Sequence, residues 1–393
     1  MDWVHAARQW ASFAFARWQN RPVEPPSASL IEADVRRLGL APLLHRALSD
    51  AADPRAALFA PDYRHSTVSN LLRLGQARRV RQALAARGLP SVLLKGGAFL
   101  ARIAPDDPGI RPMADVDLLV DPARFDEAAH VLSGLGFRRT SERYAFSRSS
   151  ALAEAFVRDE GPFPVEIDLH RALAPWPILP GLTRSVLSHS ERVGEWLVAP
   201  VAETLALIAV HRARHAFVWS CGDLLEVRHL VGGLDDDAWQ RAIARVTALG
   251  ALGAVYATLG QAIYWLGPET TSDRTRLEAL GAGMGRVRRR VLDQVAHGTG
   301  LLARPRTWQR PMARYLVVYP ASMASLARSV AAGLVYLPAR AADEWTAARR
   351  DDGGVRPGFR ALWHHLAGGT AAAETRRRTA DGTPAREAGT DRA

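Results

Sequence analysis

Acidic residues recur at alternate positions in two short apolar segments of this 393-residue sequence. The segment ADVDLLV contains Asp115 and Asp117, and the segment VEIDLH contains Asp168 and His170. Because side chains of a strand alternate between its faces, each pair is expected to share one face. Neighbouring carboxylates repel one another and resist burial unless a cation neutralises them. The spacing therefore indicates binding of a divalent cation.

A third carboxylate extends this prediction if the two segments form neighbouring strands. Asp168 would then join Asp115 and Asp117 in a site for two Mg²⁺ ions, which prefer oxygen ligands. Such a site can hold the attacking and the leaving oxygen of a phosphoryl displacement, and a carboxylate can accept the proton of an attacking hydroxyl. Taken alone, an acidic pair on a strand is more often a solvated sheet edge, so the prediction depends on the neighbouring motifs.

A glycine pair in the segment VLLKGGAFL supplies the second motif. It follows a short apolar run, typical of a buried strand, and precedes a helical pattern. Gly96 and Gly97 allow a close turn into a helix, whose first N–H groups can bind phosphate. Lys95 is the only lysine among 51 lysine and arginine residues. With Arg111 as a second phosphate clamp, these residues form the candidate nucleotide-binding set.

Three histidines are candidates for lining a substrate pocket. His211 and His215 are four residues apart on one helical face, and His170 follows Asp168 in its strand. The segment HRARH lacks the glutamate of HExxH, and a zinc site completed by Glu226 is disfavoured. Asp223 and Glu226 could pair with His or Arg across helices, although a simply packed helical hairpin is the preferred interpretation.

The segments LLKGGAFL, RPMADVDLLV and VEIDLHRAL together resemble the motifs of the uncharacterised nucleotidyltransferase family, within the polymerase-beta-like nucleotidyltransferase superfamily. The resemblance covers about residues 25–240. It implies transfer of a nucleoside monophosphate from an NTP to a hydroxyl-type acceptor (a small molecule, peptide or protein), with release of pyrophosphate. It further implies that Asp115 and Asp117 hold the metals, that Asp168 completes the site, and that the glycine turn holds the triphosphate.

The expected fold is α/β in the α+β sense. It is a minimal nucleotidyltransferase fold with a small mixed sheet, embedded in helical regions. Helical spacing occurs over residues 28–50, 66–88 and 122–134, and FRRTSERYAFSR is a candidate hairpin. The sequence divides into an N-terminal helical region at 1–87, an α/β core at 88–175, a helical substrate-side region at 176–270, a basic and amphipathic helical region at 271–366, and a disordered tail at 367–393.

The cysteine content and the N-terminal residues indicate the cellular compartment in which the protein is expected to act. Cys221 is the only cysteine, which excludes a disulfide framework and a cysteine-rich zinc site, and it is expected to be a buried apolar residue. The first residues are amphipathic and lack the apolar run of a secretory signal. A cytoplasmic location is expected.

The formal net charge is +11, and the interval Arg286–Arg314 contains eight arginines against one acid. This interval could bind nucleic acid or another anionic surface, or it could be a solvated face. Residues 315–338 are apolar, but Pro320 and Arg328 interrupt them, so an amphipathic helix is favoured over a transmembrane span.

The alternative function is a catalytically silent binding module that uses the basic interval for RNA, a peptide or a membrane surface. The three clustered aspartates favour the enzyme.

Overall fold

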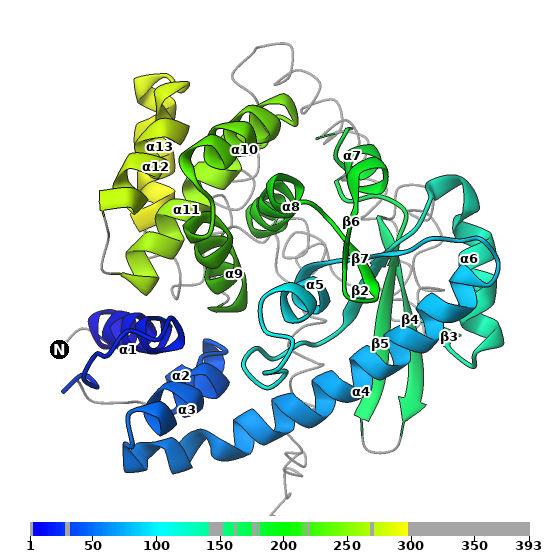
Figure 1. Ribbon diagram of the computed structural model, residues 1–393, viewed down its shortest axis with the longest axis horizontal. Coiled ribbons are helices and arrows are strands. Elements are labelled where there is room, and N and C mark those ends of the chain that lie inside the picture. The colour runs from blue at the N-terminus through cyan, green and yellow to red at the C-terminus, as the bar shows by residue number, and fades with distance from the viewer. Residues whose placement is uncertain are drawn as a thin grey trace, which may run out of the picture.

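The structure is a computed structural model, and Figure 1 shows its arrangement. It describes residues 3–27, 32–140, 152–160, 163–174, 179, 181–214, 217, 221–267 and 271–297. The predicted amphipathic segment 315–338, the tail 367–393 and the part of the basic interval after residue 297 lie outside these residues.

The N-terminal region is helical, as the sequence predicts. Where one helical pattern covers 28–50, the structure has two helices, because Gly39 adopts a left-handed backbone with φ +66° and ends the first of them. The next long helix is followed by Gly88, which also has a positive φ. The elements are α1 (Trp3–Trp18), α2 (Glu32–Arg37), α3 (Ala41–Asp50), the 3₁₀ helix η1 (Pro54–Phe59) and α4 (Ala60–Ala85).

A seven-stranded mixed sheet lies at the centre of the α/β part, in the order β3-β4-β5-β2-β1-β7-β6. The pairs β2/β5 and β1/β7 are parallel, and the other neighbouring strands are antiparallel. The expected α+β fold with a mixed sheet is thus confirmed. The strands are β1 (Val92–Leu93), β2 (Val116–Leu119), β3 (Arg138–Arg139), β4 (Ala153–Glu160), β5 (Phe163–His170), β6 (Glu191–Val193) and β7 (Trp196–Val198).

Two parts of the sheet differ from the sequence-based expectation. The first residues of the candidate hairpin form β3, but β3 pairs with β4, and residues 141–151 lie outside the described part of the chain. The hairpin β6–β7 extends the sheet beyond residue 175, in a region where the sequence indicates helices. The division of the chain into domains remains a prediction.

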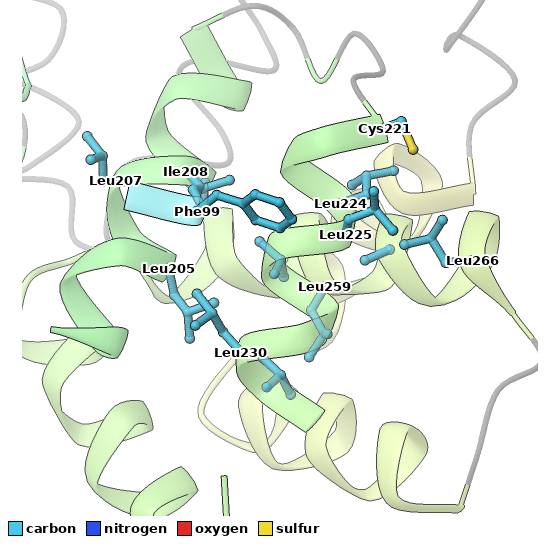
Figure 2. Packing of buried hydrophobic residues seen from close by; sticks show 14 of the residues in the cluster. Phe99, Leu205, Leu207, Ile208, Cys221, Leu224, Leu225, Leu230, Leu259 and Leu266 are labelled. Atoms are coloured by element: carbon cyan, nitrogen blue, oxygen red, sulfur yellow. The ribbon is translucent and has the colours of Figure 1, made fainter. Parts of the chain in front are cut away.

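The two faces of the sheet pack against different helices. On one face, Val116 and Leu118 of β2 pack with the C-terminal half of α4 and with Phe125 of α6 (Phe125–Gly134). A larger core on the other face joins α5 (Lys95–Arg102), α8 (Val201–Arg214), α9 (Cys221–Gly232) and α11 (Leu252–Leu266). Figure 2 shows Phe99 of α5 near Ile208 of α8 and the leucines of α9 within this core. Asp117, between Val116 and Leu118, therefore points toward the α5 side.

The remaining elements are helical and surround this larger core. They are α7 (Leu182–His189), α10 (Asp236–Ala248), α12 (Thr271–Ala282) and α13 (Arg286–His297), while the exposed 3₁₀ helix η2 (Pro122–Arg124) leads into α6 on the other face. Among the described residues, none of the helices is both long and apolar enough to cross a membrane.

Candidate functional site

The pairing of β2 with β5 brings the two acidic segments together. The register places Asp117 opposite Asp168 and Leu119 opposite His170. Ligand atoms of Asp117, Asp168 and His170 all lie within 4.8 Å of one another. The two segments form neighbouring strands, as the three-carboxylate prediction requires. The group that they bring together contains His170 in place of Asp115, so the site of three carboxylates stays a prediction.

Asp117 is the buried centre of this group, with 2 % of its surface exposed. Its Oδ1 accepts a hydrogen bond from Lys95 Nζ at 2.5 Å and lies 2.7 Å from His170 Nε2. Burial alone would raise the pKa of Asp117, but Lys95 and His170 together outweigh burial and hold this pKa well below its usual range. Burial likewise opposes the charge of Lys95, yet Asp117 raises the lysine pKa above its ordinary value. The two residues form an ion pair in which Asp117 is buried and Lys95 is half-buried.

Asp115 behaves in the opposite way. Burial, followed by the nearby charges of Asp117 and Asp168, raises its pKa to about 7. Two carboxyl groups only two residues apart thus have pKa values displaced in opposite directions, which is the result expected when like charges crowd one site. A divalent cation among these carboxylates would relieve the repulsion.

The residues present fit a divalent cation. Two adjacent carboxylates and a buried imidazole converge, and His170 Nδ1 is a buried atom without a hydrogen-bond partner in the described part of the chain. Carboxylate oxygens suit Mg²⁺ and Mn²⁺, and an added imidazole nitrogen suits Mn²⁺ better than Mg²⁺.

The glycine pair lies directly beside this group, at the start of α5. A Cβ atom on Gly97 would lie 2.7 Å from Leu93 Cδ1, and one on Gly96 would lie 2.9 Å from Met113 Cγ. Both glycines therefore allow α5 to pack closely on β1 and on the segment before β2. The left-handed backbone is at Lys95, with φ +46°, and not at a glycine. The sequence contains no signal for that conformation.

Arg111 lies in a buried ion-pair network with α9. Its Nη2 donates to Asp223 at 2.9 Å, its Nη1 donates to Glu226 at 3.2 Å, and its guanidinium stacks over Phe99. Gly222 makes room for this side chain, because a Cβ there would lie 2.1 Å from Arg111 Nε. The acids Asp223 and Glu226 thus pair across elements, which was the less favoured of the two interpretations. The phosphate-binding role of Arg111 remains a prediction.

His211 and the acidic end of α9 face the same region. His211 is half-buried on α8. Burial would raise the pKa of Asp223, but Arg111 and Arg212, and to a smaller extent His211 and Lys95, together lower it. Arg212, the next residue on α8, lies 3.6 Å from Asp223. His215 lies outside the described residues. These interactions place His211 near Asp223, and a substrate-lining role remains a prediction for His211, His215 and His170.

Asn70 on α4 is a further residue of the site that the sequence motifs do not reveal. It is fully buried, and its Nδ2 donates to the carbonyl oxygens of Pro108 and Arg111 at 2.7 Å each. Its Oδ1 accepts a bond from Met113 N at 3.3 Å. One side chain therefore holds the loop that leads into Asp115. A polar residue on the buried face of a helical pattern is the only signal in the sequence.

The architecture and the site define a class of protein. A strand–glycine–helix unit, an acidic pair at the start of the neighbouring strand and a third acid on the next strand are the parts of a nucleotidyltransferase core. The chain belongs to the uncharacterised nucleotidyltransferase family, whose model matches residues 31–267. Comparisons with curated proteins and with solved structures found no match. The resemblance stated from the sequence motifs is thus confirmed at the level of the family.

Proposed function

We propose that the protein is an enzyme that transfers a nucleoside monophosphate from an NTP to a hydroxyl group and releases pyrophosphate, with a divalent cation bound at the acidic strands. The observation that carries the proposal is the convergence of Asp117, Asp168 and His170 beside Lys95 and the glycine turn. Family membership supports nucleotidyl transfer in general. The cation, the acceptor and the residue roles belong to the proposal.

Asp117 and Asp168 would hold the cation, with Asp115 and His170 as the neighbouring ligands. When bound, Mg²⁺ or Mn²⁺ supplies a Lewis acid that neutralises charge on the transferred phosphoryl group. The expectation of a second ion at Asp115 is part of this proposal. The raised pKa of Asp115 supports a second ion there, because the carboxyl group lies close enough to Asp117 and Asp168 for their charges to raise its pKa.

The transfer itself needs a phosphate grip and a proton acceptor. Lys95 and the first N–H groups of α5, at Gly96 and Gly97, would hold the phosphates, because a helix start leaves these donors without intrahelical partners. The acceptor oxygen forms a bond to the α-phosphorus, and the bond from that phosphorus to the bridging oxygen of the β-phosphate breaks. Asp168 takes the hydroxyl proton, and pyrophosphate leaves with the bonding electrons.

Release of pyrophosphate tests this function. The protein is incubated with Mg²⁺ or Mn²⁺ and each NTP in turn, ATP included, with pools of small-molecule, peptide and protein hydroxyl acceptors. Asp117→Asn and Asp168→Asn should each lower pyrophosphate release by about a hundredfold or more, since each removes a charge that positions the cation. Chelation with EDTA should abolish the release.

Asp126→Asn is the matched control, because Asp126 is exposed on α6 and lies outside both acidic segments. Release that is unchanged in the Asp117 and Asp168 variants would contradict the proposal. NTP binding without turnover in every acceptor pool, together with salt-dependent RNA binding, would instead support the binding-module alternative.

A further inference from the structure

Arg73 lies near the middle of α4, one turn after Asn70. The C-terminal half of α4 packs on the face of β2 opposite Asp117, whereas Asn70 binds the loop that leads into Asp115. Arg73 follows Asn70 by three residues, so the two side chains leave the helix on the same side. Because Asn70 binds the loop before Asp115, this spacing directs Arg73 toward the start of β2.

The acidic residues Asp115 and Glu166 lie near Arg73, but they do not accept hydrogen bonds from all of its guanidinium N–H groups. The side chain is half-buried, and its Nε is a buried atom without a hydrogen-bond partner in the described part of the chain. Burial lowers the pKa of Arg73, while the charges of Asp115 and Glu166 raise it. Arginine stays protonated under all ordinary conditions. A permanent cation therefore lies near the candidate metal carboxylates without a direct bond to them.

The other arginines around the site are already bound to protein groups. Arg111 pairs with Asp223 and Glu226, and Arg102 donates to Glu191 and to the carbonyl of Ala199. Arg212 donates from Nη2 to Gln261 Oε1 at 2.6 Å. Arg73 differs from these three, because its buried Nε has no hydrogen-bond partner among the described residues and no ion pair holds its guanidinium there, so its planar set of donors can bind a ligand. Such a donor set matches phosphate oxygens.

We propose that Arg73 binds the phosphate groups of the NTP, from α4, while Lys95 binds them from α5. This inference rests on the proposed function and adds a substrate-binding residue that lies outside all three sequence motifs. The competing explanation is that Arg73 only offsets the negative charge of Asp115 and Glu166. The two explanations differ in what the residue stabilises: a bound triphosphate in the first, the ligand-free site in the second.

The test is the affinity for the NTP that the wild-type protein binds, measured by calorimetry with Mn²⁺ and a non-hydrolysable α,β-methylene analogue. Arg73→Met should weaken binding by about tenfold to a hundredfold, because charge-assisted bonds to phosphate are lost. Arg73→Lys keeps the charge and should fall between Arg73→Met and wild type. Inorganic tripolyphosphate should compete with the analogue less effectively in Arg73→Met than in wild type. Arg79→Met, an exposed position on the same helix, is the matched control and should bind as wild type does.

Thermal unfolding of each variant separates loss of fold from loss of affinity. Equal affinity in wild type and Arg73→Met, with both proteins folded, would overturn the role of Arg73 and leave the proposed function intact. Unchanged NTP affinity with a lower melting temperature in Arg73→Met would assign the residue to charge compensation and would also overturn the inference. A wild-type protein that binds no NTP in the presence of Mn²⁺ would overturn the proposed function, and the inference with it.

Discussion

At the scale of single residues, the site is governed by competition for one oxygen atom. Asp117 Oδ1 contacts both Lys95 Nζ and His170 Nε2. A cation that takes this oxygen must compete with the lysine ammonium. Lys95 also has a left-handed backbone, which costs a non-glycine residue about 1–2 kcal/mol. That cost at a residue in contact with the site agrees with a functional position for the ammonium group.

Lys95→Met should therefore change two affinities in opposite directions. Removal of the ammonium frees Asp117 Oδ1 and removes a repelling charge, so Mn²⁺ binding in the absence of nucleotide should tighten by several-fold. NTP binding should weaken, by about tenfold, because a phosphate partner is lost. Titration of Mn²⁺ by calorimetry, followed by titration of the NTP, measures both effects. Arg79→Met again serves as the control, and weaker Mn²⁺ binding in Lys95→Met would refute the competition.

The residues of the site differ in how far their sequence context could predict them. Strand alternation placed Asp117 and Asp168 on matching faces, because that pattern is local. The partners of Arg111 depend on how α9 packs, which no local pattern encodes. The same holds for Arg73, whose position follows from the path of a long helix across the sheet.

At the scale of elements, the network around Arg111 connects α9 with the segment that leads into β2. Arg111 and Glu226 are buried, Asp223 is half-buried, and Arg111 stacks on Phe99 of α5. Burial raises the pKa of Glu226 to about 7, although Arg111 acts in the opposite direction. One of the two acids that hold Arg111 therefore becomes ionised near neutral pH.

The raised pKa of Glu226 predicts a pH-dependent stability. Between about pH 4.5 and pH 7 the folded state keeps the proton that the unfolded state releases, so rising pH favours unfolding over this interval. Glu226→Gln cannot ionise and should lose this component. The free energy of unfolding of wild type minus that of Glu226→Gln should thus fall between pH 5 and pH 8, by on the order of 1–3 kcal/mol.

Urea unfolding at pH 5 and at pH 8 measures this difference, and taking it between the two proteins cancels the contribution of other titrating groups. Exposed Glu127→Gln provides the matched control and should show no such change. A difference that stays constant from pH 5 to pH 8 would contradict the assignment.

The elements themselves were predictable where the pattern is strong. The apolar runs that contain Val92, Val116 and Ile167 indicated three strands, and all three form and pair. Strand β4 was not predicted because AEAFVRDE carries four charged residues. Strand β7 is short and lies in a region where the sequence indicates helices. Both depend on pairing with a neighbouring strand, which gives them backbone partners and one buried face.

At the scale of the whole molecule, the helices outside the acidic strands share one core with them. The larger core includes Trp10 of α1, Phe99 of α5 and Tyr256 of α11. Hydrogen bonds reinforce it, since Ser12 Oγ donates to the carbonyl of Gly267 at 2.7 Å. Helix α1 precedes residues 31–267, which the family model matches, yet it packs into the same core. The described helices and the sheet are therefore expected to unfold together.

Cys221 can report on that cooperativity, because it is the only cysteine and begins α9 inside the shared core (Figure 2). It is 2 % exposed, and burial raises the pKa of its thiol to about 12. At pH 8 the thiolate is the reactive form, so the native thiol should react with a disulfide reagent roughly a thousandfold more slowly than the unfolded chain. Reaction across a urea series should rise at the same midpoint as loss of helical circular dichroism. Reaction at clearly lower urea would show that α9 opens separately and would contradict a single cooperative core.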